Sequence, residues 1–303
     1  MCGIIGILGK SEVQDRLVDG LARLEYRGYD SAGIAVVDGA TFGVVKAVGK
    51  LDNLRTALVR RPLVGRVGIG HTRWATHGAA NEVNAHPHRA ENVTVVHNGI
   101  IENHSEIKEE LRALGVVFVS DTDTQVLAQL MNRALVTAPT LDEAFEATLR
   151  RLVGSFAIAI VVEGYEDLML VARRGSPLAI GYGARAEDGS AEMFVGSDAL
   201  ALAPFTEDVS YLEDGDWAVL THDRVLVRDA RGLEVTREIR RVPAETFAVD
   251  KGPYRHFMLK EIHEQPESLA RCLRNLVDHS EGKLKPILPG VDFALADRII
   301  LVA

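Results

Sequence analysis

Met1-Cys2-Gly3-Ile4-Ile5-Gly6-Ile7-Leu8-Gly9 opens the chain and decides how the rest of it is interpreted. Residues 2–8 are an apolar run that predicts a short buried strand. Cys2 stands at its start, and removal of Met1 would leave a thiol and a free α-amine on one residue. The amine titrates near pH ~8 and can act as a base, while an ionised thiol is a nucleophile. The alternative is a small buried hydrophobe at the start of a strand.

Composition narrows the function classes. The 303 residues are 47% hydrophobic, which suffices for a full core, and the net charge of -9 disfavours nucleic acid and anionic membranes as partners. No apolar run approaches the ~20 residues of a membrane span, and the first residues lack the basic start of a secretory signal. We therefore expect a cytoplasmic protein. Cys2 and Cys272 are too few for a disulfide framework.

The order of predicted elements indicates a layered architecture. Strands come first, a helical block follows, and strands then return, which favours two packed sheets with helices outside, an α+β or α/β layered fold. Periodicity predicts helices over 51–59, 103–114, 121–136 and 141–152, and strands over 2–8, 33–37, 42–48, 67–70, 93–97, 156–162, 168–172, 178–182 and 193–196.

Two capping boxes are expected at helix starts. Ser11 precedes Gln14 by three residues, and Asn103 precedes Glu106 by the same spacing. Asp121 is expected to cap the helix that follows it. If Asp121 has that role, Asp123 is left over and could bind an ammonium group.

The chain changes character near residue 240. Residues 240–256 carry two prolines, a glycine and mixed charge, which is typical of a linker, and residues 257–277 predict a helix interrupted at Pro266. The apolar end, 298–303, predicts a buried strand that needs neighbours. The expected organisation is a domain over 2–240, a linker and helical segment over 241–279, and the start of a second α/β domain over 280–303 that is cut short.

One dense polar cluster follows a predicted strand. His71-Thr72-Arg73-Trp74-Ala75-Thr76-His77-Gly78 combines a guanidinium, an indole, hydroxyls and imidazoles. Arg73 suits bidentate capture of a carboxylate, and Trp74 could form a wall or lid. An isolated Arg-Trp pair is usually surface stacking, but so dense a group at a strand end is more often a site.

Asn98 and Gly99 are candidates for an oxyanion hole. The Asn98 side-chain amide and the Gly99 backbone N–H could converge as donors during attack on an amide carbonyl. Asn-Gly is also a strong hairpin signal, so a type I′ turn is the alternative. Six histidines lie between residues 71 and 104, but their spacing forms no compact zinc pattern, so no metal and no cofactor is predicted.

Together these stretches resemble the glutaminase domain of the glucosamine-6-phosphate synthase family. The match runs along nearly the whole chain in the family's order and is carried by the following motifs: Met1 to Ile4, Tyr26 to Gly33, His71 to Gly78, Asn84 to His88, Val96 to His104, Thr122 to Thr124 and Tyr254 to Pro266. The resemblance implies an amino-terminal-nucleophile hydrolase fold, a four-layer αββα sandwich.

The resemblance also implies a role for each matching residue. Cys2 would be the nucleophile, with its α-amine as base through a water, and Asn98 with Gly99 would stabilise the oxyanion. Arg73 would hold the glutamine α-carboxylate and Asp123 its α-ammonium. The remaining family positions would line the mobile loop over glutamine (Trp74, Thr76 and His77) or support the site (Arg27, Gly28, His86 and His97).

In that family, glutamine nitrogen is transferred to fructose 6-phosphate. Residues 280–303 would be the start of the family's sugar isomerase domain, whose sugar-binding and isomerising residues are absent from these 303 residues. We therefore expect the chain alone to act only as a glutaminase, and we expect a homo-oligomer for the full-length enzyme. Two alternatives are the glutaminase half of another class II amidotransferase, such as the one that makes phosphoribosylamine, and a non-catalytic glutamine-binding module. The Tyr26 to Gly33 motif disfavours the first, and Cys2, Asn98 and Asp123 disfavour the second.

Overall fold

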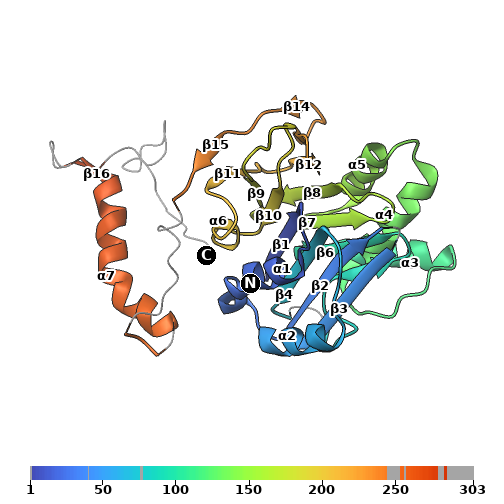
Figure 1. Cartoon of the computed structure of the whole chain (residues 1–303), viewed down its shortest axis with the longest axis horizontal. Coiled ribbons are helices and arrows are strands. Elements are labelled where there is room, and N and C mark those ends of the chain that lie inside the picture. The colour runs from blue at the N-terminus through green and yellow to red at the C-terminus, as the bar shows by residue number, and fades with distance from the viewer. Residues whose placement is uncertain are drawn as a thin grey trace, which may run out of the picture. The chain divides into compact units, whose positions relative to one another are not determined.

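The computed structural model describes residues 2–39, 41–75, 78–243, 253–255, 257–278 and 283–284. The chain divides into two units, Met1–Ala248 and Val249–Ala303, and each is described by itself. The first unit holds two antiparallel sheets and the helices that cover them (Figure 1). Within the described residues, no helix is both long and apolar enough to cross a membrane.

The first sheet brings the amino-terminal strand into its interior. Within the described residues it has eight strands, and every neighbouring pair is antiparallel. Their order across the sheet is β15 (Ile239–Arg241), β11 (Asp208–Tyr211), β9 (Ala179–Tyr182), β10 (Met193–Gly196), β1 (Gly3–Leu8), β4 (Val67–Arg73), β2 (Ser31–Asp38) and β3 (Thr41–Val48).

The second sheet contains the longest strand pairing among the described residues. Its seven described strands are also antiparallel, and β6 and β7 pair over nine residues each. Their order is β14 (Glu234–Val235), β13 (Val225–Arg228), β12 (Trp217–Thr221), β8 (Leu168–Arg174), β7 (Gly154–Val162), β6 (Val93–Ile101) and β5 (His88–Ala90).

Side-chain alternation along the strands produces the layers. In β7, Phe156 and Ile158 point into a helix-covered core, whereas Ala157 and Ala159 point into the core between the two sheets. The first sheet is covered on its outer face by α1 (Gln14–Ala22), α2 (Leu51–Arg60) and α6 (Ala199–Leu202), and the second by α3 (His104–Ala113), α4 (Asp123–Thr137) and α5 (Leu141–Arg151). The predicted αββα sandwich is confirmed.

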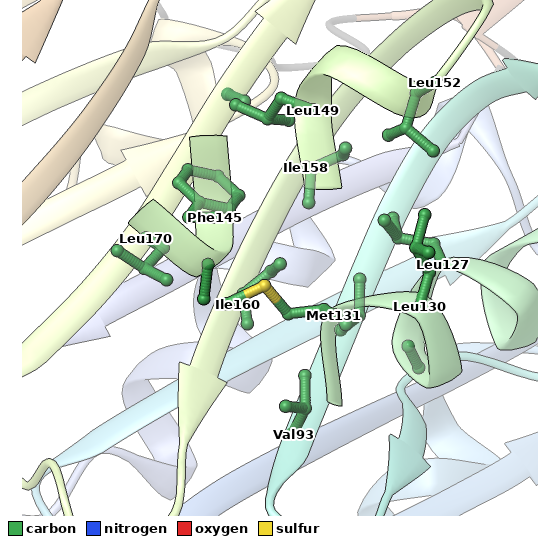
Figure 2. Close-up of a cluster of buried hydrophobic side chains, with 14 of the residues drawn as sticks. Val93, Leu127, Leu130, Met131, Phe145, Leu149, Leu152, Ile158, Ile160 and Leu170 are labelled. Atoms are coloured by element: carbon green, nitrogen blue, oxygen red, sulfur yellow. The ribbon is translucent and has the colours of Figure 1, made fainter. Parts of the chain in front are cut away.

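The core under α4 and α5 shows how a helix is fixed to its sheet. Leu127, Leu130 and Met131 on α4 and Phe145 on α5 pack against Ile158 and neighbouring strand residues (Figure 2). Burying one such side chain contributes about 1.5–3 kcal/mol. This cluster therefore fixes α4, whose first turn carries Asp123.

The helix starts differ from the predicted capping boxes. Gln14 accepts a hydrogen bond from Leu63 N at 2.8 Å, and Asn103 accepts one from Val153 N at 3.0 Å. Neither side chain therefore forms a capping box with its own helix. These side chains stabilise distant segments instead. Thr122, and not Asp121, caps α4 by accepting a bond from Gln125 N. Asp121 was therefore the wrong choice of cap.

The second unit contains one long helix. The helix α7 (Phe257–Leu276) runs through Pro266, so the predicted interruption is wrong; a proline removes only one backbone hydrogen bond and the helix continues beyond it. Two short strands, β16 (Val277–Asp278) and β17 (Lys283–Leu284), pair after it. Most of the predicted linker and the apolar end at 298–303 lie outside the described residues. The domain boundaries stay predictions.

Candidate active site

Cys2 lies immediately before β1, beside the end of β4. Strand pairing sets this position, because Gly3 lies opposite Thr72. The half-buried Cys2 thiol contacts one residue twice: Trp74 N–H donates to Sγ at 3.3 Å, and Sγ–H donates to Trp74 O at 3.5 Å. The pairing of β1 with β4 thus places the Cys2 sulfur against the backbone N–H and C=O of Trp74.

The segment of residues 73–75 is held in place by residues 28–30. Asp30 N donates to Arg73 O at 3.1 Å, and the Asp30 carboxylate accepts from Ala75 N. A Cβ on Gly28 would lie 2.8 Å from the carbonyl carbon of Arg73, so only glycine fits there. The supporting role predicted for Gly28 thus has a packing basis, whereas the Arg27 side chain lies outside the described residues.

Arg73 and Trp74 differ sharply in exposure. The Arg73 side chain is buried and donates to the backbone oxygens of Gly78 and Ala79, both at 3.3 Å. Trp74 is 46% exposed and stands edge-on to Tyr29, with ring centroids 5.4 Å apart. Arg73 is therefore a fixed cation under the surface, and Trp74 an exposed wall. Thr76 and His77 lie outside the described residues.

Asn98 and Gly99 lie inside β6 and form no hairpin turn. Asn98 is opposite Ala157 on β7, and this long pairing overrides the local turn preference. Asn98 Nδ2 donates to the backbone oxygen of Cys2 at 3.1 Å. Gly99 has a φ of +121°, and a Cβ there would lie 2.0 Å from Ser155 O. The strand therefore requires glycine beside the donor amide.

The first turn of α4 presents a carboxylate. Asp123 is 7% exposed, and its Oδ2 accepts from Ile101 N at 2.9 Å. Its Oδ1 lies 3.8 Å from His97 Nδ1, which is also 3.0 Å from Thr124 Oγ1. A carboxylate at a helix amino terminus is stabilised by the helix dipole.

These elements line one small pocket, which has about 300 Å³ of empty space including its opening to solvent. A nucleophile, a cation and a carboxylate face the same pocket. Its lining comes from the chain start, β4, the segment after β4, β6 and α4, and consists of Cys2, Arg73, Trp74, His86, His97, Gly99, Thr122, Asp123 and Thr124. Seven of these are predicted site residues. Their individual roles remain predictions.

Other residues of the site escaped prediction. Thr122 and Thr124 line the pocket, Asp30 holds the segment beside Cys2, and two more histidines, His71 and His88, lie buried next to His86. All five stand inside or beside motifs already singled out. Within the described part of the chain, no group of three or more His, Cys, Asp or Glu is arranged to hold a metal ion.

Burial keeps the imidazoles neutral. It lowers the pKa of His71 to about 3 and the pKa of His86 well below its ordinary value. Burial also lowers the pKa of His97, although Asp123 opposes this shift. For Cys2, burial raises the thiol pKa, while the Trp74 backbone N–H and Arg73 partly counteract it.

The segment that carries His86 is anchored from behind. Lys46 Nζ donates to Ala85 O at 2.7 Å, and burial lowers the pKa of Lys46 to about 8. A Cβ on Gly33 would lie 2.2 Å from His86 O, so β2 and this segment touch directly. The segment of His86 is therefore held by the backbone of β2 at Gly33 and by the Lys46 side chain of β3.

Comparison with known proteins agrees with this geometry. A family model described as "Glutamine amidotransferase domain" matches residues 71–203, which include Arg73, Asn98 and Asp123. Residues 71–203 belong to a glutamine amidotransferase domain. Two solved structures share the fold of this amidotransferase domain: a glutamine phosphoribosylpyrophosphate amidotransferase from B. subtilis (TM-score 0.64, 26% identity) and an allosteric regulatory enzyme of purine biosynthesis (TM-score 0.63, 28% identity). The match to each structure covers 75% of this chain and 49% of the length of the solved chain. They place the amidotransferase domain among the class II, amino-terminal-nucleophile type.

Sequence relatives extend the likeness beyond the amidotransferase domain. Enzymes named glutamine--fructose-6-phosphate aminotransferase [isomerizing] from Caulobacter vibrioides and Mesorhizobium japonicum are 53% and 51% identical over the whole chain. The chain spans about half the length of these curated relatives, 49% in both cases.

Proposed function

We propose that this chain hydrolyses the side-chain amide of L-glutamine, giving glutamate and ammonia, with Cys2 as nucleophile. One observation supports this most: the Cys2 thiol, the Asn98 amide, the Arg73 guanidinium and the Asp123 carboxylate converge on one pocket or touch its nucleophile. Glutamine carries an α-carboxylate and an α-ammonium, which match Arg73 and Asp123 in charge. Its amide carbon would then lie toward Cys2.

The reaction has two steps. The Cys2 sulfur attacks the amide carbon, and Asn98 Nδ2 with Gly99 N–H donate to the oxyanion. The C–N bond breaks, ammonia leaves with the proton that the thiol gave up, and a γ-glutamyl thioester remains. Water then adds to the thioester, releasing glutamate and restoring the thiol. After removal of Met1, the Cys2 α-amine serves as the base.

We further propose that the ammonia is transferred to fructose 6-phosphate when these residues form part of a longer enzyme. The relatives at about 50% identity carry this reaction in their name. They favour the sugar phosphate over the phosphoribosyl acceptor, whose solved enzyme is only 26% identical. We expect the longer enzyme to be a cytoplasmic homo-oligomer.

The test is glutamine hydrolysis by the purified chain, followed as glutamate release. Intact mass must show loss of Met1, because the α-amine is otherwise blocked. We expect hydrolysis and covalent labelling of Cys2 by a glutamine analogue with an electrophilic side chain. A chain that lacks Met1 yet shows neither would overturn the proposal.

A further inference from the structure

An oxyanion hole that uses an asparagine side chain requires the carboxamide to be fixed in one of its two orientations. The carboxamide of Asn98 has a donor end, Nδ2, and an acceptor end, Oδ1, of nearly equal shape. Nδ2 carries two hydrogens: one goes to Cys2 O, and the second remains for substrate. A rotated amide would present oxygen to the developing oxyanion and repel it.

The acceptor end of Asn98 faces a buried histidine. His71, on β4 and fully buried, lies with Nε2 3.0 Å from Asn98 Oδ1 and 3.0 Å from His97 O. Both of these oxygens can only accept. A hydrogen on His71 Nε2 satisfies them, whereas a lone pair there would face two acceptors.

The surroundings of the second ring nitrogen of His71, Nδ1, indicate the same tautomer. Nδ1 is buried and has no hydrogen-bond partner, so a hydrogen there would be an orphaned donor. Burial also keeps the ring from taking a second proton. His71 therefore carries its single hydrogen on Nε2, and His86 Nδ1, 3.2 Å away, faces it as an acceptor.

We propose that His71 is a positioning residue that locks the Asn98 carboxamide with its donor end toward Cys2, through the hydrogen on Nε2. This inference rests on the proposed glutaminase function. His71 does not touch the reacting atoms and acts through Asn98 alone. Its contribution to hydrolysis is therefore in turnover and not in glutamine binding.

Two amide substitutions separate this role from simple packing. The Nε2 of glutamine is four bonds from Cα, as is His71 Nε2, whereas the amide nitrogen of asparagine is three bonds away, as is the unpartnered Nδ1. His71→Gln can therefore still donate to Asn98 Oδ1, and His71→Asn cannot reach it. Both place a polar amide at the same buried position.

We would measure kcat and KM for glutamine hydrolysis in both variants. His71→Asn is expected to lower kcat at least tenfold, up to the ~10²–10³-fold loss caused by removing an oxyanion donor, with KM nearly unchanged. His71→Gln is expected to stay within about tenfold of the unaltered protein. His71→Asn added to Asn98→Ala should cause no further loss, since both act on one interaction.

Two readouts separate this inference from the proposed function. Alkylation of Cys2 by iodoacetamide forms no oxyanion, and its rate should be equal in both variants. The Asn98 side-chain amide resonances report its hydrogen bonds without turnover; they should move in His71→Asn and stay in His71→Gln. Equal kcat and equal Asn98 resonances in both variants would overturn the role of His71. An inactive unaltered protein with the expected resonances would overturn only the glutaminase proposal.

Discussion

Cys2 and Trp74 hold each other through a two-way contact, in which the Trp74 backbone N–H lies 3.3 Å from Sγ and its carbonyl oxygen 3.5 Å away. The oxygen can accept the thiol hydrogen, and the N–H can stabilise the thiolate. The backbone of one residue, Trp74, thus serves both protonation states of the sulfur. This makes the thiol the first group to test.

Replacing Cys2 by alanine should abolish glutamine hydrolysis, because Cys2 carries the one thiol among the described residues that line the pocket. The fold should persist, since the side chain is small and only half-buried. Glutamate release and thermal unfolding check both expectations. The matched control is Cys272→Ala, the only other cysteine of the chain, which should leave hydrolysis unchanged. Residual hydrolysis in Cys2→Ala would contradict the assignment.

Alkylation of Cys2 should show a raised thiol pKa. Burial disfavours the thiolate, so at a given pH less of it is present than in a free cysteine. Iodoacetamide should therefore react more slowly at pH 7 than it does with a free cysteine, and the rate should rise through a pKa above the ordinary thiol value. A pH profile with its midpoint below that value would refute the effect of burial.

Arg73→Lys should raise KM for glutamine by about 10–100-fold, because lysine keeps the charge but loses the two-pronged geometry for a carboxylate. Its kcat should change less. Arg112→Lys on the exposed surface of α3 is the matched control and should leave KM unaltered. Steady-state kinetics with glutamine compares the two. Equal KM values for Arg73→Lys and the control would argue against carboxylate binding by Arg73.

Gly99→Ala should destabilise the fold and remove activity. Its Cβ would overlap Ser155 O at 2.0 Å in a backbone with φ +121°, so we expect a loss of at least ~2 kcal/mol in the free energy of unfolding. Gly164→Ala provides the comparison: φ is +82°, but nothing lies within 4 Å, so only the backbone cost of about 1 kcal/mol applies. Denaturant unfolding would show whether this difference exists.

Acid should destabilise the fold through the buried histidines. The pKa of His71 is about 3 in the folded chain, against about 6.5 when unfolded. Between these values the unfolded state binds more protons, so the free energy of unfolding falls as pH drops from 6.5 toward 3, by about 1.4 kcal/mol per pH unit for this residue. Denaturant unfolding at pH 7 and 5 tests it. His71→Gln, which does not titrate, should have the smaller slope; an unchanged slope would speak against a neutral buried His71.

The sequence predicts the layers well because side-chain alternation is local. The strand over 156–162 and the helix over 141–152 follow from their own residues. Contacts between residues far apart in the sequence could not be predicted in the same way. Asn98 and Gly99 resemble a turn until β7 pairs with them, and Gln14 resembles a cap until Leu63 comes within 2.8 Å.

The site was predicted mainly through its charged and reactive groups. Cys2, Arg73 and Asp123 stand out because their chemistry is unusual in their positions. His71 was overlooked because its value depends on a neutral tautomer and on two oxygens from β6, 26 and 27 residues further along. A tautomer is set by surroundings that only folding assembles.

Asn98 on the second sheet contacts Cys2, which lies just before β1 of the first sheet, so the small alanines between the sheets act as a spacer. Ala157 packs in that core directly opposite Asn98 on the neighbouring strand. Each methyl group added there would push the two sheets apart and widen the gap between Cys2 and Asn98, the proposed nucleophile and oxyanion donor. The geometry of the proposed site therefore depends on the thickness of the core between the two sheets, which lies away from the substrate pocket.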